Sequence, residues 1–250
     1  MDKRIIIVTG AARGIGLSTT ELFLQEGACV VMVDIDKIEL DKVSRNLRGA
    51  LAIECDVSDP EQVDAMITTA LLEFGQIDSL VNNAGVADFG PIEQTSYTQW
   101  RRVMATNLDG VFLCSQAAIP ELKRSKGNIV NIASISGLRA STLRTAYGTS
   151  KAAVIHLTQQ QAAELGEFGV RANCVAPGPV RTKLAMAVHT QDIIDAYHDA
   201  IPLNRYGTEK EIAQAIVFLC SPMASYITGQ VIAADGGFES TGVGLPSLRS

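Results

Sequence analysis

Residues 4–16 read RIIIVTGAARGIG, and this stretch decides the fold class. Its first part, Arg4 to Val8, is a short apolar and β-branched run, which is typical of a strand buried on both faces. A glycine-rich turn follows at once, and Leu17, Leu22 and Phe23 then repeat with helical spacing. A strand, a glycine-rich turn and a helix in this order predict a phosphate-binding turn, because the free N–H groups of the helix N-terminus face the phosphate.

The glycines of this turn follow the spacing Gly10-x-x-x-Gly14-x-Gly16. Glycine allows a tight turn and lets the backbone approach a phosphate closely. The spacing differs from the usual G-x-G-x-x-G, so the generic dinucleotide motif fits imperfectly. The turn nevertheless predicts a dinucleotide site, whose candidate residues are Gly10, Arg13, Gly14, Ile15 and Gly16.

An acidic residue ends the second apolar run, Cys29 to Val33. Asp34 stands eighteen residues after Gly16, close to the interval expected for a carboxylate that accepts hydrogen bonds from the ribose hydroxyls of NAD. The same carboxylate would repel the 2′-phosphate of NADP. Arg13 argues the other way, because a cation in the glycine turn could meet that phosphate. The acid is better placed, so we expect NAD; the alternative is a strand-end aspartate that starts a turn.

Polar or small residues also follow the next two strand-like runs. Ala50 to Cys55 is followed by Asp56-Val57, and Ser79 to Val81 by Asn82-Asn83-Ala84-Gly85. An open α/β sheet places its ligand at the carboxyl ends of its strands. These residues therefore extend the predicted site, although Asn, Asp and Gly also favour ordinary turns.

Three further residues suggest proton transfer. Tyr147 and Lys151 are one helical turn apart, and Ser134 lies thirteen residues before the tyrosine. A phenol with its ordinary pKa near ~10 is a poor base at neutral pH, but an ammonium at i+4 favours the phenolate. A serine hydroxyl beside it could hold a substrate oxygen. Such a set can move a proton on or off an alcohol or ketone.

In combination these motifs resemble the short-chain dehydrogenase/reductase family, and they span most of the chain. The resemblance rests on Thr9-Gly10-x-x-x-Gly14-Ile15-Gly16, Asp56-Val57, Asn82-Asn83-Ala84-Gly85, Asn107, Ser134, Tyr147-x-x-x-Lys151 and Pro177-Gly178. Each match is weak alone, but all of them in the family's order are highly specific. The resemblance implies one Rossmann-type domain, a nicotinamide cofactor and oxidoreduction of a CH–OH group.

The resemblance also implies roles for individual residues. Tyr147 exchanges a proton with the substrate oxygen, and Lys151 lowers the pKa of the phenol and holds the nicotinamide ribose. Ser134 steadies the oxygen, and Asn107 supports a water chain from the lysine, although taken alone Asn107 would suit a helix surface. The remaining implied cofactor-binding residues are Asp34, Asp56, Val57, Asn83, Ala84, Gly85, Pro177, Gly178, Val180 and Thr182.

Strand-like runs alternate with helical segments throughout, which predicts a doubly wound parallel sheet of seven strands with helices on both faces. The last three expected strands are 128–133, 170–175 and 230–234. The expected helices are 14–26, 37–47, 60–74, 98–122, 147–168 and 209–220. We expect a single domain over residues 1–250.

One stretch, residues 183–206, interrupts the alternation. In the family this segment often covers the substrate, so we expect a flap here with one or two amphipathic helices that carry Ile193, Ile194 and Tyr197 on one face. His189 and His198 are expected to be surface or packing residues rather than catalytic groups.

The composition excludes several classes of function. The net charge of −6, without a dense basic cluster, argues against nucleic-acid binding. The five cysteines are spread apart and mostly apolar in context, which suits a reducing compartment, and no C-x-x-C pair or histidine cluster suggests a metal. We find no signal peptide and no membrane-spanning stretch. The expectation is a cytoplasmic protein and, from the family, a homotetramer.

The substrate is less constrained by the sequence. Ser136, Arg139 and Arg144 are candidate substrate residues, because an arginine near Tyr147 can bind an oxyanion bidentately. The polar stretch 139–145 favours a small polar substrate: a sugar, polyol, diol or hydroxy acid, in which a secondary alcohol and a ketone (or a sugar lactol and lactone) interconvert. Two alternatives stay open, an NADPH-dependent 3-oxoacyl-thioester reductase and a non-catalytic NAD-sensing regulator.

Overall fold

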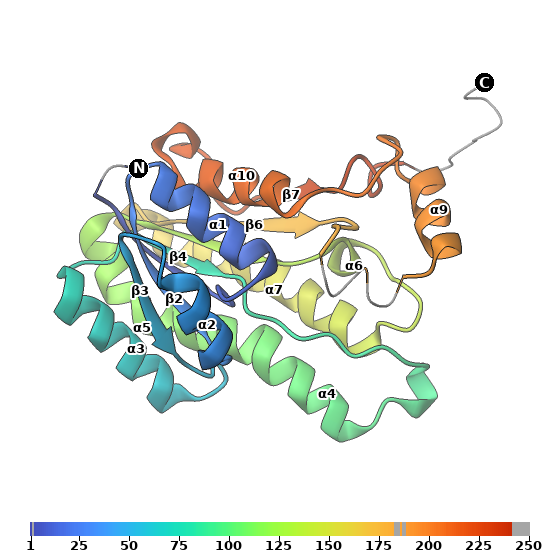
Figure 1. Ribbon diagram of the computed structural model, residues 1–250, viewed down its shortest axis with the longest axis horizontal. Helices are drawn as coiled ribbons and strands as arrows, with labels where there is room; N and C mark the ends of the chain where they lie inside the picture. Colours follow the sequence, from blue (N-terminus) through green and yellow to red (C-terminus); the bar gives the residue numbers. More distant parts are fainter. Residues whose placement is uncertain (2, 183–185, 187–188, 242–250) are drawn as a thin grey trace.

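A single parallel sheet forms the centre of the protein. The computed structural model describes residues 1, 3–182, 186 and 189–241. Seven parallel strands follow the order β3-β2-β1-β4-β5-β6-β7 (Figure 1), which confirms the predicted fold class. Their bounds are β1 Ile5–Thr9, β2 Cys29–Asp34, β3 Ala50–Glu54, β4 Ser79–Asn82, β5 Asn128–Ile132, β6 Arg171–Pro177 and β7 Val231–Ala234.

Helices cover both faces of the sheet. The main helices are α1 Gly14–Gln25, α2 Lys37–Ser44, α3 Pro60–Phe74, α4 Tyr97–Met104, α5 Gly110–Ser125, α6 Ile135–Leu138, α7 Thr145–Leu165, α9 Gln191–Ala200 and α10 Glu209–Cys220. One core joins the sheet to α3, α5 and α7, and the other joins it to α1, α2 and α10. The inner strands β1, β4 and β5 are wholly buried, because apolar side chains from both of their faces enter a core, whereas the edge strands β3 and β7 are largely half-buried.

Helix α3 shows how local sequence sets an element's ends. The Asp59 carboxylate accepts hydrogen bonds from the backbone of Glu61 and Gln62, Pro60 occupies the first turn, and the helix ends at Gly75 in a left-handed conformation. A capping acid, an N-terminal proline and a C-terminal glycine are the usual signals for these positions. The predicted start of this helix is confirmed.

The predicted helix 98–122 is divided in the structure. Residues Ala105–Asp109 form a π-helical turn between α4 and α5, so the continuous α-helix was wrong at this point. An extra residue in one turn cannot be read from hydrophobic spacing, and such turns often occur at functional sites. The predicted helix 147–168 also begins earlier, at Thr145, and its last turn is a 3₁₀ helix over Gly166–Phe168. The short helix α6 was not predicted.

The strand order reverses next to β1, which has β2 on one side and β4 on the other. Ligands of open α/β sheets bind in the crevice at such a reversal. Here the Thr9 hydroxyl accepts hydrogen bonds from the backbone N–H groups of Asn83 and Ala84, both at 3.0 Å. The glycine turn after β1 and the Asn83–Gly85 segment after β4 therefore share one edge of the crevice.

The expected flap is described only in part. Residues 183–185 and 187–188 lie outside the described residues. Helix α9 confirms one amphipathic helix, on which Ile194 and Tyr197 are half-buried while Ile193 is exposed. Ile193 therefore does not belong to the packed face predicted for it, because that face follows a spacing of three residues from Ile194 to Tyr197.

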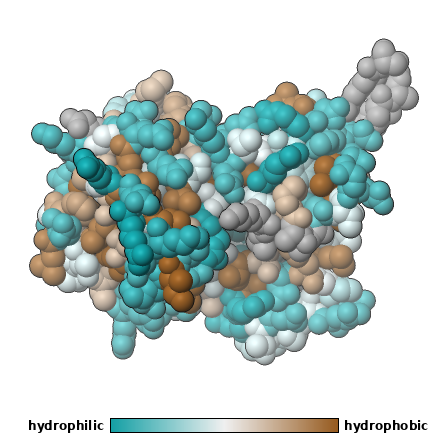
Figure 2. Space-filling view, in the orientation of Figure 1, coloured by the Kyte–Doolittle hydropathy of each residue, from teal (hydrophilic) through white to brown (hydrophobic). Residues whose placement is uncertain are grey.

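The outer surface is mixed in character. Figure 2 shows hydrophilic side chains interspersed with smaller hydrophobic areas on the face that carries α1 and α2. The exposed apolar residues of this region include Ile35 and Ile38. Among the described helices, none has the length and apolar character that a membrane crossing requires.

Candidate active site

The predicted catalytic residues come together at the carboxyl end of the sheet. Ser134 follows β5 and caps α6, where its hydroxyl accepts a hydrogen bond of 3.1 Å from the Ser136 N–H. Tyr147 and Lys151 lie in the first two turns of α7. Ser134 also hydrogen-bonds to Tyr147. The structure thus places the serine hydroxyl beside the phenol, as the proton-transfer reading requires.

Burial dominates the acidity of the Tyr147 phenol. It raises the pKa of the phenol, while the hydrogen bond with Ser134 and the positive charge of Arg144 lower it. The nearest cation in the sequence to lower the pKa of the phenol is thus Arg144, three positions before it. The expectation that Lys151 also tunes the phenol stays a prediction.

The lysine has a backbone partner instead. The Lys151 ammonium donates a 2.7 Å hydrogen bond to the carbonyl oxygen of Ile132, and its Nζ lies 5.8 Å from the centroid of the Tyr147 ring. The side chain is 4% exposed, and burial lowers the pKa of its ammonium to about 8. Sequence reasoning missed the Ile132 carbonyl, because backbone acceptors leave no signal in the sequence.

Asn107 lies inside the π-helical turn and is 0% exposed, which rules out a helix-surface amide. Its Oδ1 accepts from the Val86 N–H at 2.8 Å, and its Nδ2 donates to the Val86 carbonyl at 2.9 Å and to the Ser150 hydroxyl at 3.1 Å. The Ser150 hydroxyl in turn donates to the Tyr147 carbonyl at 2.7 Å. The amide therefore ties the strand β4 loop to the catalytic helix.

Ser150 was not among the predicted residues. It is fully buried and links Asn107 to the backbone of Tyr147. The signal available in the sequence was its place three residues after the tyrosine, on the same helical face. We read it as a positioning residue that orients both groups.

The glycine turn fits a pyrophosphate. A Cβ on Gly16 would lie 2.6 Å from the Asn83 Nδ2 and closer still to the Gly10 carbonyl, so the three segments can meet only if position 16 is glycine. Helix α1 begins without a side-chain cap and without an acidic residue in its first turn. Its N-terminal N–H groups are therefore free of side-chain partners and carry a positive dipole end.

Asp34 and Arg13, whose charges favour different cofactors, have different partners in the structure. Each oxygen of the Asp34 carboxylate accepts one 3.0 Å backbone hydrogen bond, from Ala12 and from Asp36. An ionised carboxylate oxygen has a second acceptor site, so both remain able to accept from ribose hydroxyls. The Arg13 guanidinium forms an ion pair with Asp36, and this hydrogen bond raises the pKa of Arg13.

The other predicted cofactor residues follow the carboxyl ends of β3 and β4. The Asp56 carboxylate accepts from the N–H and the hydroxyl of Ser58, at 2.9 and 2.7 Å. Val57 is buried beneath Gly110, where a Cβ would lie 2.8 Å from the valine. The Asn83 Nδ2 donates to the carbonyls of Thr9 and Gly10, and its backbone N–H donates to the Thr9 hydroxyl. These donors are therefore used within the protein, which leaves the side-chain and backbone oxygens of Asn83 as its groups without a hydrogen-bond partner among the described residues.

Two glycines, Gly85 and Gly178, mark close approaches between segments on this side of the site. A Cβ on Gly85 would lie 3.6 Å from the Lys151 Nζ, so the segment after β4 passes directly over the lysine. Beyond β6, a Cβ on Gly178 would lie 2.6 Å from the Asp235 side chain. Pro177 ends the strand, Val180 is buried, and the Thr182 N–H donates to the Val180 carbonyl at 2.8 Å.

The three candidate substrate residues have different surroundings. Ser136 is buried, and its hydroxyl lies 3.2 Å from that of Ser141. The Arg139 guanidinium donates to the Phe238 carbonyl and lies 5.3 Å from the Phe238 ring centroid. The Arg144 guanidinium instead lies 4.6 Å from the ring centroid of Phe89, next to Tyr147. Of the two arginines, only Arg144 is placed against the catalytic phenol.

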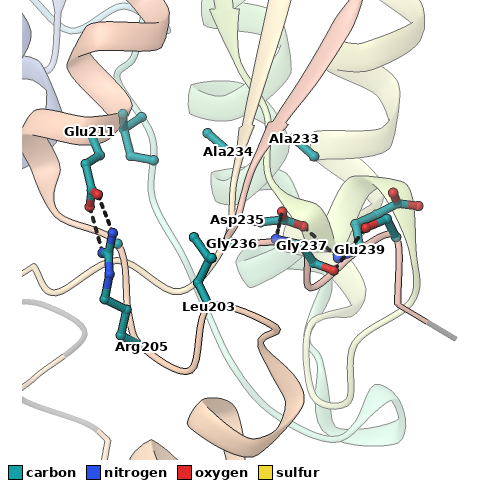
Figure 3. Close-up of a pocket in the computed structure, with 12 residues that line it drawn as sticks. Leu203, Arg205, Glu211, Ala233, Ala234, Asp235, Gly236, Gly237 and Glu239 are labelled. Atoms are coloured by element: carbon teal, nitrogen blue, oxygen red, sulfur yellow. Dashed lines mark hydrogen bonds and ion pairs between the residues drawn. The ribbon is translucent and has the colours of Figure 1, made fainter. Parts of the chain in front are cut away.

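Besides a small cavity of about 120 Å³ whose lining includes Phe89, Gly90, Thr145 and Ala146, two larger cavities are found among the described residues. One, of about 290 Å³, is lined by Ile135, Arg139, Ala140, Ser141, Ala200, Phe238 and Thr241. The other, of about 620 Å³, lies beside β7 at the start of α10, where Arg205 pairs with Glu211 and Asp235 holds the backbone of Gly237 and Glu239 (Figure 3). Neither cavity is lined by Ser134, Tyr147 or Lys151, but the 290 Å³ cavity includes Ile135, the residue after Ser134, so we give the 620 Å³ cavity no part in the chemistry. Within the described ranges, no cluster of three or more possible metal ligands occurs.

The chain was compared with known proteins. The family model described as "Enoyl-(Acyl carrier protein) reductase", a short-chain dehydrogenase model, matches residues 10–239. The chain is 40% identical to meso-2,3-butanediol dehydrogenase of Serratia marcescens, over 94% of each protein. It is 37% identical to a 3-oxoacyl-[acyl-carrier-protein] reductase of Thermotoga maritima, over 95% of this chain and 98% of the relative.

Among solved structures, the chain resembles the 3-ketoacyl-(acyl-carrier-protein) reductase of Brucella melitensis in complex with NADH. The TM-score is 0.91 and the sequence identity 32%, over 95% of this chain and 99% of the other. The likeness therefore extends over the whole sheet and its helices.

Proposed function

This chain belongs to the short-chain dehydrogenase/reductase family, and from that premise we propose that it uses NAD to interconvert a secondary alcohol and a ketone (or a lactol and a lactone) on a small polar substrate. Family membership makes it a nicotinamide-dependent oxidoreductase that acts on CH–OH groups. The finer points, which are the preference for NAD, the substrate class and the roles of single residues, are our proposal. One observation supports it above all, the contact of Ser134 with the half-buried Tyr147.

The chain's own residues divide the work of the reaction. When bound, the nicotinamide ring supplies the hydride chemistry. Tyr147 takes the hydroxyl proton of an alcohol, or gives one to a ketone oxygen. Ser134 donates a hydrogen bond to that oxygen as negative charge develops on it. Lys151, which is held between the Ile132 carbonyl and the Tyr147 ring, is the group that would bind the nicotinamide ribose.

Two carboxylates favour NAD over NADP. Asp34 keeps an acceptor site on each oxygen for ribose hydroxyls, and its negative charge opposes a 2′-phosphate. Arg13, the cation that could have neutralised such a phosphate, is already paired with Asp36. The remaining proposed cofactor contacts are those of the glycine turn and of the Asp56, Asn83–Gly85 and Pro177–Thr182 segments.

Replacing Asp34 with serine is expected to narrow the preference for NAD by about tenfold or more. The change removes a charge-assisted hydrogen bond, worth about 1.5–3 kcal/mol, and the repulsion of a 2′-phosphate. The readout is the ratio of kcat/KM for NAD⁺ to kcat/KM for NADP⁺. The double variant Asp34→Ser/Asp36→Asn, which also releases Arg13, should move the ratio further towards NADP. A native protein that already prefers NADP would contradict our assignment of Asp34.

The substrate proposal rests on the polar side chains at the 290 Å³ cavity. Arg139 and Ser141 line this cavity, and the Ser136 hydroxyl lies 3.2 Å from that of Ser141. The volume of the cavity suits a compact molecule rather than a long acyl chain. The Serratia relative is named as a dehydrogenase of meso-2,3-butanediol, a small diol, which agrees with this class. We propose a sugar, polyol, diol or hydroxy acid.

The test of the proposed function is turnover. The protein is incubated with NAD⁺ or NADP⁺ and a panel of diols, polyols, aldoses and hydroxy acids, and reduced nicotinamide is followed by its absorbance. We expect NAD⁺-dependent oxidation of at least one of these classes. Tight binding of NAD without turnover of any alcohol or ketone would favour an NAD-sensing regulator instead.

A second candidate function is 3-oxoacyl-thioester reduction with NADPH, because relatives with that activity match nearly the whole chain. The Asp34 carboxylate and the net charge of −6 argue against it, since an acidic carrier protein binds best to a basic surface. Reduction of a 3-oxoacyl thioester by NADPH faster than any oxidation in the panel would establish this alternative.

The state of the cysteines supports a proposal about the compartment in which the protein works. Four of the cysteines are buried and Cys29 is half-buried, and all are free thiols, which is consistent with a cytoplasmic, reducing compartment. The homotetramer, the single domain over residues 1–250 and the flap at 183–206 rest on the family resemblance.

A further inference from the structure

Arg144 has an unusual position for a charged residue. It directly precedes α7, and its guanidinium carbon lies 4.6 Å from the ring centroid of Phe89 and 6.0 Å from that of Tyr147. Phe89 and Tyr147 also contact each other edge to face, with their centroids 6.4 Å apart. The cation therefore lies against two aromatic rings, one of which carries the proposed acid and base.

The backbone holds the arginine in this place. Leu143, the residue before it, adopts a left-handed conformation with φ of 63°, which costs a non-glycine residue about 1 kcal/mol or more. The Leu143 carbonyl accepts a 3.1 Å hydrogen bond from the Gly90 N–H, and Gly90 and Arg144 form an isolated parallel bridge. The loop after β4 passes beside the start of α7 at this point (Figure 1). The loop after β4 and the segment before α7 thus fix the position of Arg144 together.

The charge of Arg144 has no anionic partner within the part of the chain that the structure describes. Arg13, Arg102 and Arg205 each pair with a carboxylate there. Arg139 is engaged by the carbonyl and ring of Phe238. Arg144 makes no such pair, and its positive charge acts on its neighbours: it lowers the pKa of His189.

The aromatic contacts leave the donors of the guanidinium available. Stacking on a ring uses the face of the planar cation, whereas its five N–H donors point outwards in the same plane. A half-buried arginine in this state suits bidentate binding of a carboxylate or sulfonate, and charge-assisted bonds of this kind are stronger than neutral ones.

We infer that Arg144 binds an oxyanion of the substrate, so that the preferred substrates are short hydroxy or keto compounds carrying a carboxylate or sulfonate close to the reacting carbon. The inference rests on the proposed oxidoreduction at Tyr147, and it narrows the substrate class from polar to anionic. Arg144 is then a specificity-determining residue, whose aromatic support sets the distance between the anion and the reacting oxygen.

The experiment compares charged and neutral substrates of similar size. Oxidation of 3-hydroxybutyrate and of 2-hydroxypropane-1-sulfonate is measured against 2-butanol and 2,3-butanediol, with NAD⁺, in the native protein and in Arg144→Met. We expect Arg144→Met to lower kcat/KM for the anionic substrates by about 10–100-fold, mainly through KM, because charge-assisted hydrogen bonds are lost. The neutral substrates should change by less than about fivefold. The relative response of the carboxylate and the sulfonate identifies which oxyanion is preferred.

A matched variant distinguishes binding of the substrate anion by Arg144 from the general effect of removing one positive charge from the protein. Arg48→Met removes an exposed guanidinium in the segment before β3, outside the proposed site, so it should leave kcat/KM unchanged for both anionic and neutral substrates. Equal loss for both classes in Arg144→Met, or a native preference for neutral substrates, would overturn the inference and leave Arg144 as a packing residue that tunes the phenol.

A binding measurement keeps the outcome independent of turnover. Propionate and ethanesulfonate are added to the complex with NADH, and thermal unfolding is followed. We expect both ions to raise the unfolding temperature of the native complex but not that of Arg144→Met. Turnover of neutral alcohols without any effect of these ions would refute the anion site alone, whereas the absence of turnover from every substrate, charged or neutral, would refute the proposed function.

Discussion

Replacing Tyr147 with phenylalanine is expected to lower kcat by about 10²–10⁴, the usual contribution of a positioned acid or base. The change removes one oxygen atom, which is the atom that exchanges a proton with the substrate and contacts Ser134. The ring remains to pack against Phe89, so the fold should be retained. Steady-state kinetics with a saturating cofactor, together with circular dichroism, measures the effect.

The control is a second buried phenol outside the proton-transfer set. Tyr206 is buried and its hydroxyl lies 3.0 Å from the His189 Nδ1. Tyr206→Phe should cost about 1 kcal/mol of stability through the lost hydrogen bond and change kcat by less than tenfold. A folded Tyr147→Phe protein with near-native turnover would remove Tyr147 from the mechanism.

The pH dependence of turnover provides a second test of the role of Tyr147. Burial holds the pKa of the phenol above its ordinary value, so only a small fraction is phenolate at neutral pH. Alcohol oxidation uses the phenolate and should therefore accelerate from about pH 7 to about pH 9, whereas ketone reduction uses the phenol and should not. The rise should weaken above about pH 8, where the Lys151 ammonium loses its proton. Both trends should be absent from Tyr147→Phe.

Replacing Gly16 with alanine is expected to disrupt the cofactor turn. The added Cβ would lie 2.6 Å from the Asn83 Nδ2, and closer still to the Gly10 carbonyl, so β4 and the turn must move apart. We expect a loss of about 3 kcal/mol in the free energy of unfolding, at the upper end for overpacking. The KM for NAD should rise by about tenfold or more, since one charged hydrogen bond to the pyrophosphate is worth about 1.5–3 kcal/mol.

Gly166→Ala is the matched control. Gly166 has φ of −59°, and no heavy atom lies within 4 Å of an added Cβ. This change should leave the KM for NAD unaltered and stabilise the fold by about 0.4–1 kcal/mol, because the unfolded chain loses freedom. Urea unfolding and cofactor titration of both variants distinguish a local clash from a general cost of alanine. A Gly16→Ala protein that matches the control would show that the turn has room to adjust.

The fold was predictable because its inner strands are buried on both faces. Runs such as Ile5–Thr9 and Cys29–Asp34 are apolar on both faces, and each ends at a turn or an acid. The π-helical turn at Ala105–Asp109 was not predictable, because one extra residue hardly changes the hydrophobic pattern of the flanking helices. Its effect is nevertheless central, since Asn107 within this turn reaches Val86 and Ser150.

The site was predictable where side chains act along one helix or at strand ends. Tyr147 and Lys151 share a helical face by their spacing alone. Contacts between separate loops were not predictable in the same way: the pairing of Arg13 with Asp36 requires the path of two loops, and the bond from Lys151 to Ile132 has a backbone acceptor. The positions of Arg139 and Arg144 were not predictable either, because the Arg139 guanidinium contacts the ring of Phe238 and the Arg144 guanidinium contacts the ring of Phe89.

The Asp36 carboxylate carries two duties at once. It caps α2 by accepting a bond from the Glu39 N–H, and it neutralises Arg13. A substitution that removes this side chain altogether, such as Asp36→Ala, would free the arginine and also uncap the helix, at a cost of about 1 kcal/mol. Asparagine at position 36 keeps a capping oxygen, so it is the substitution that can release the guanidinium while the end of the helix stays capped.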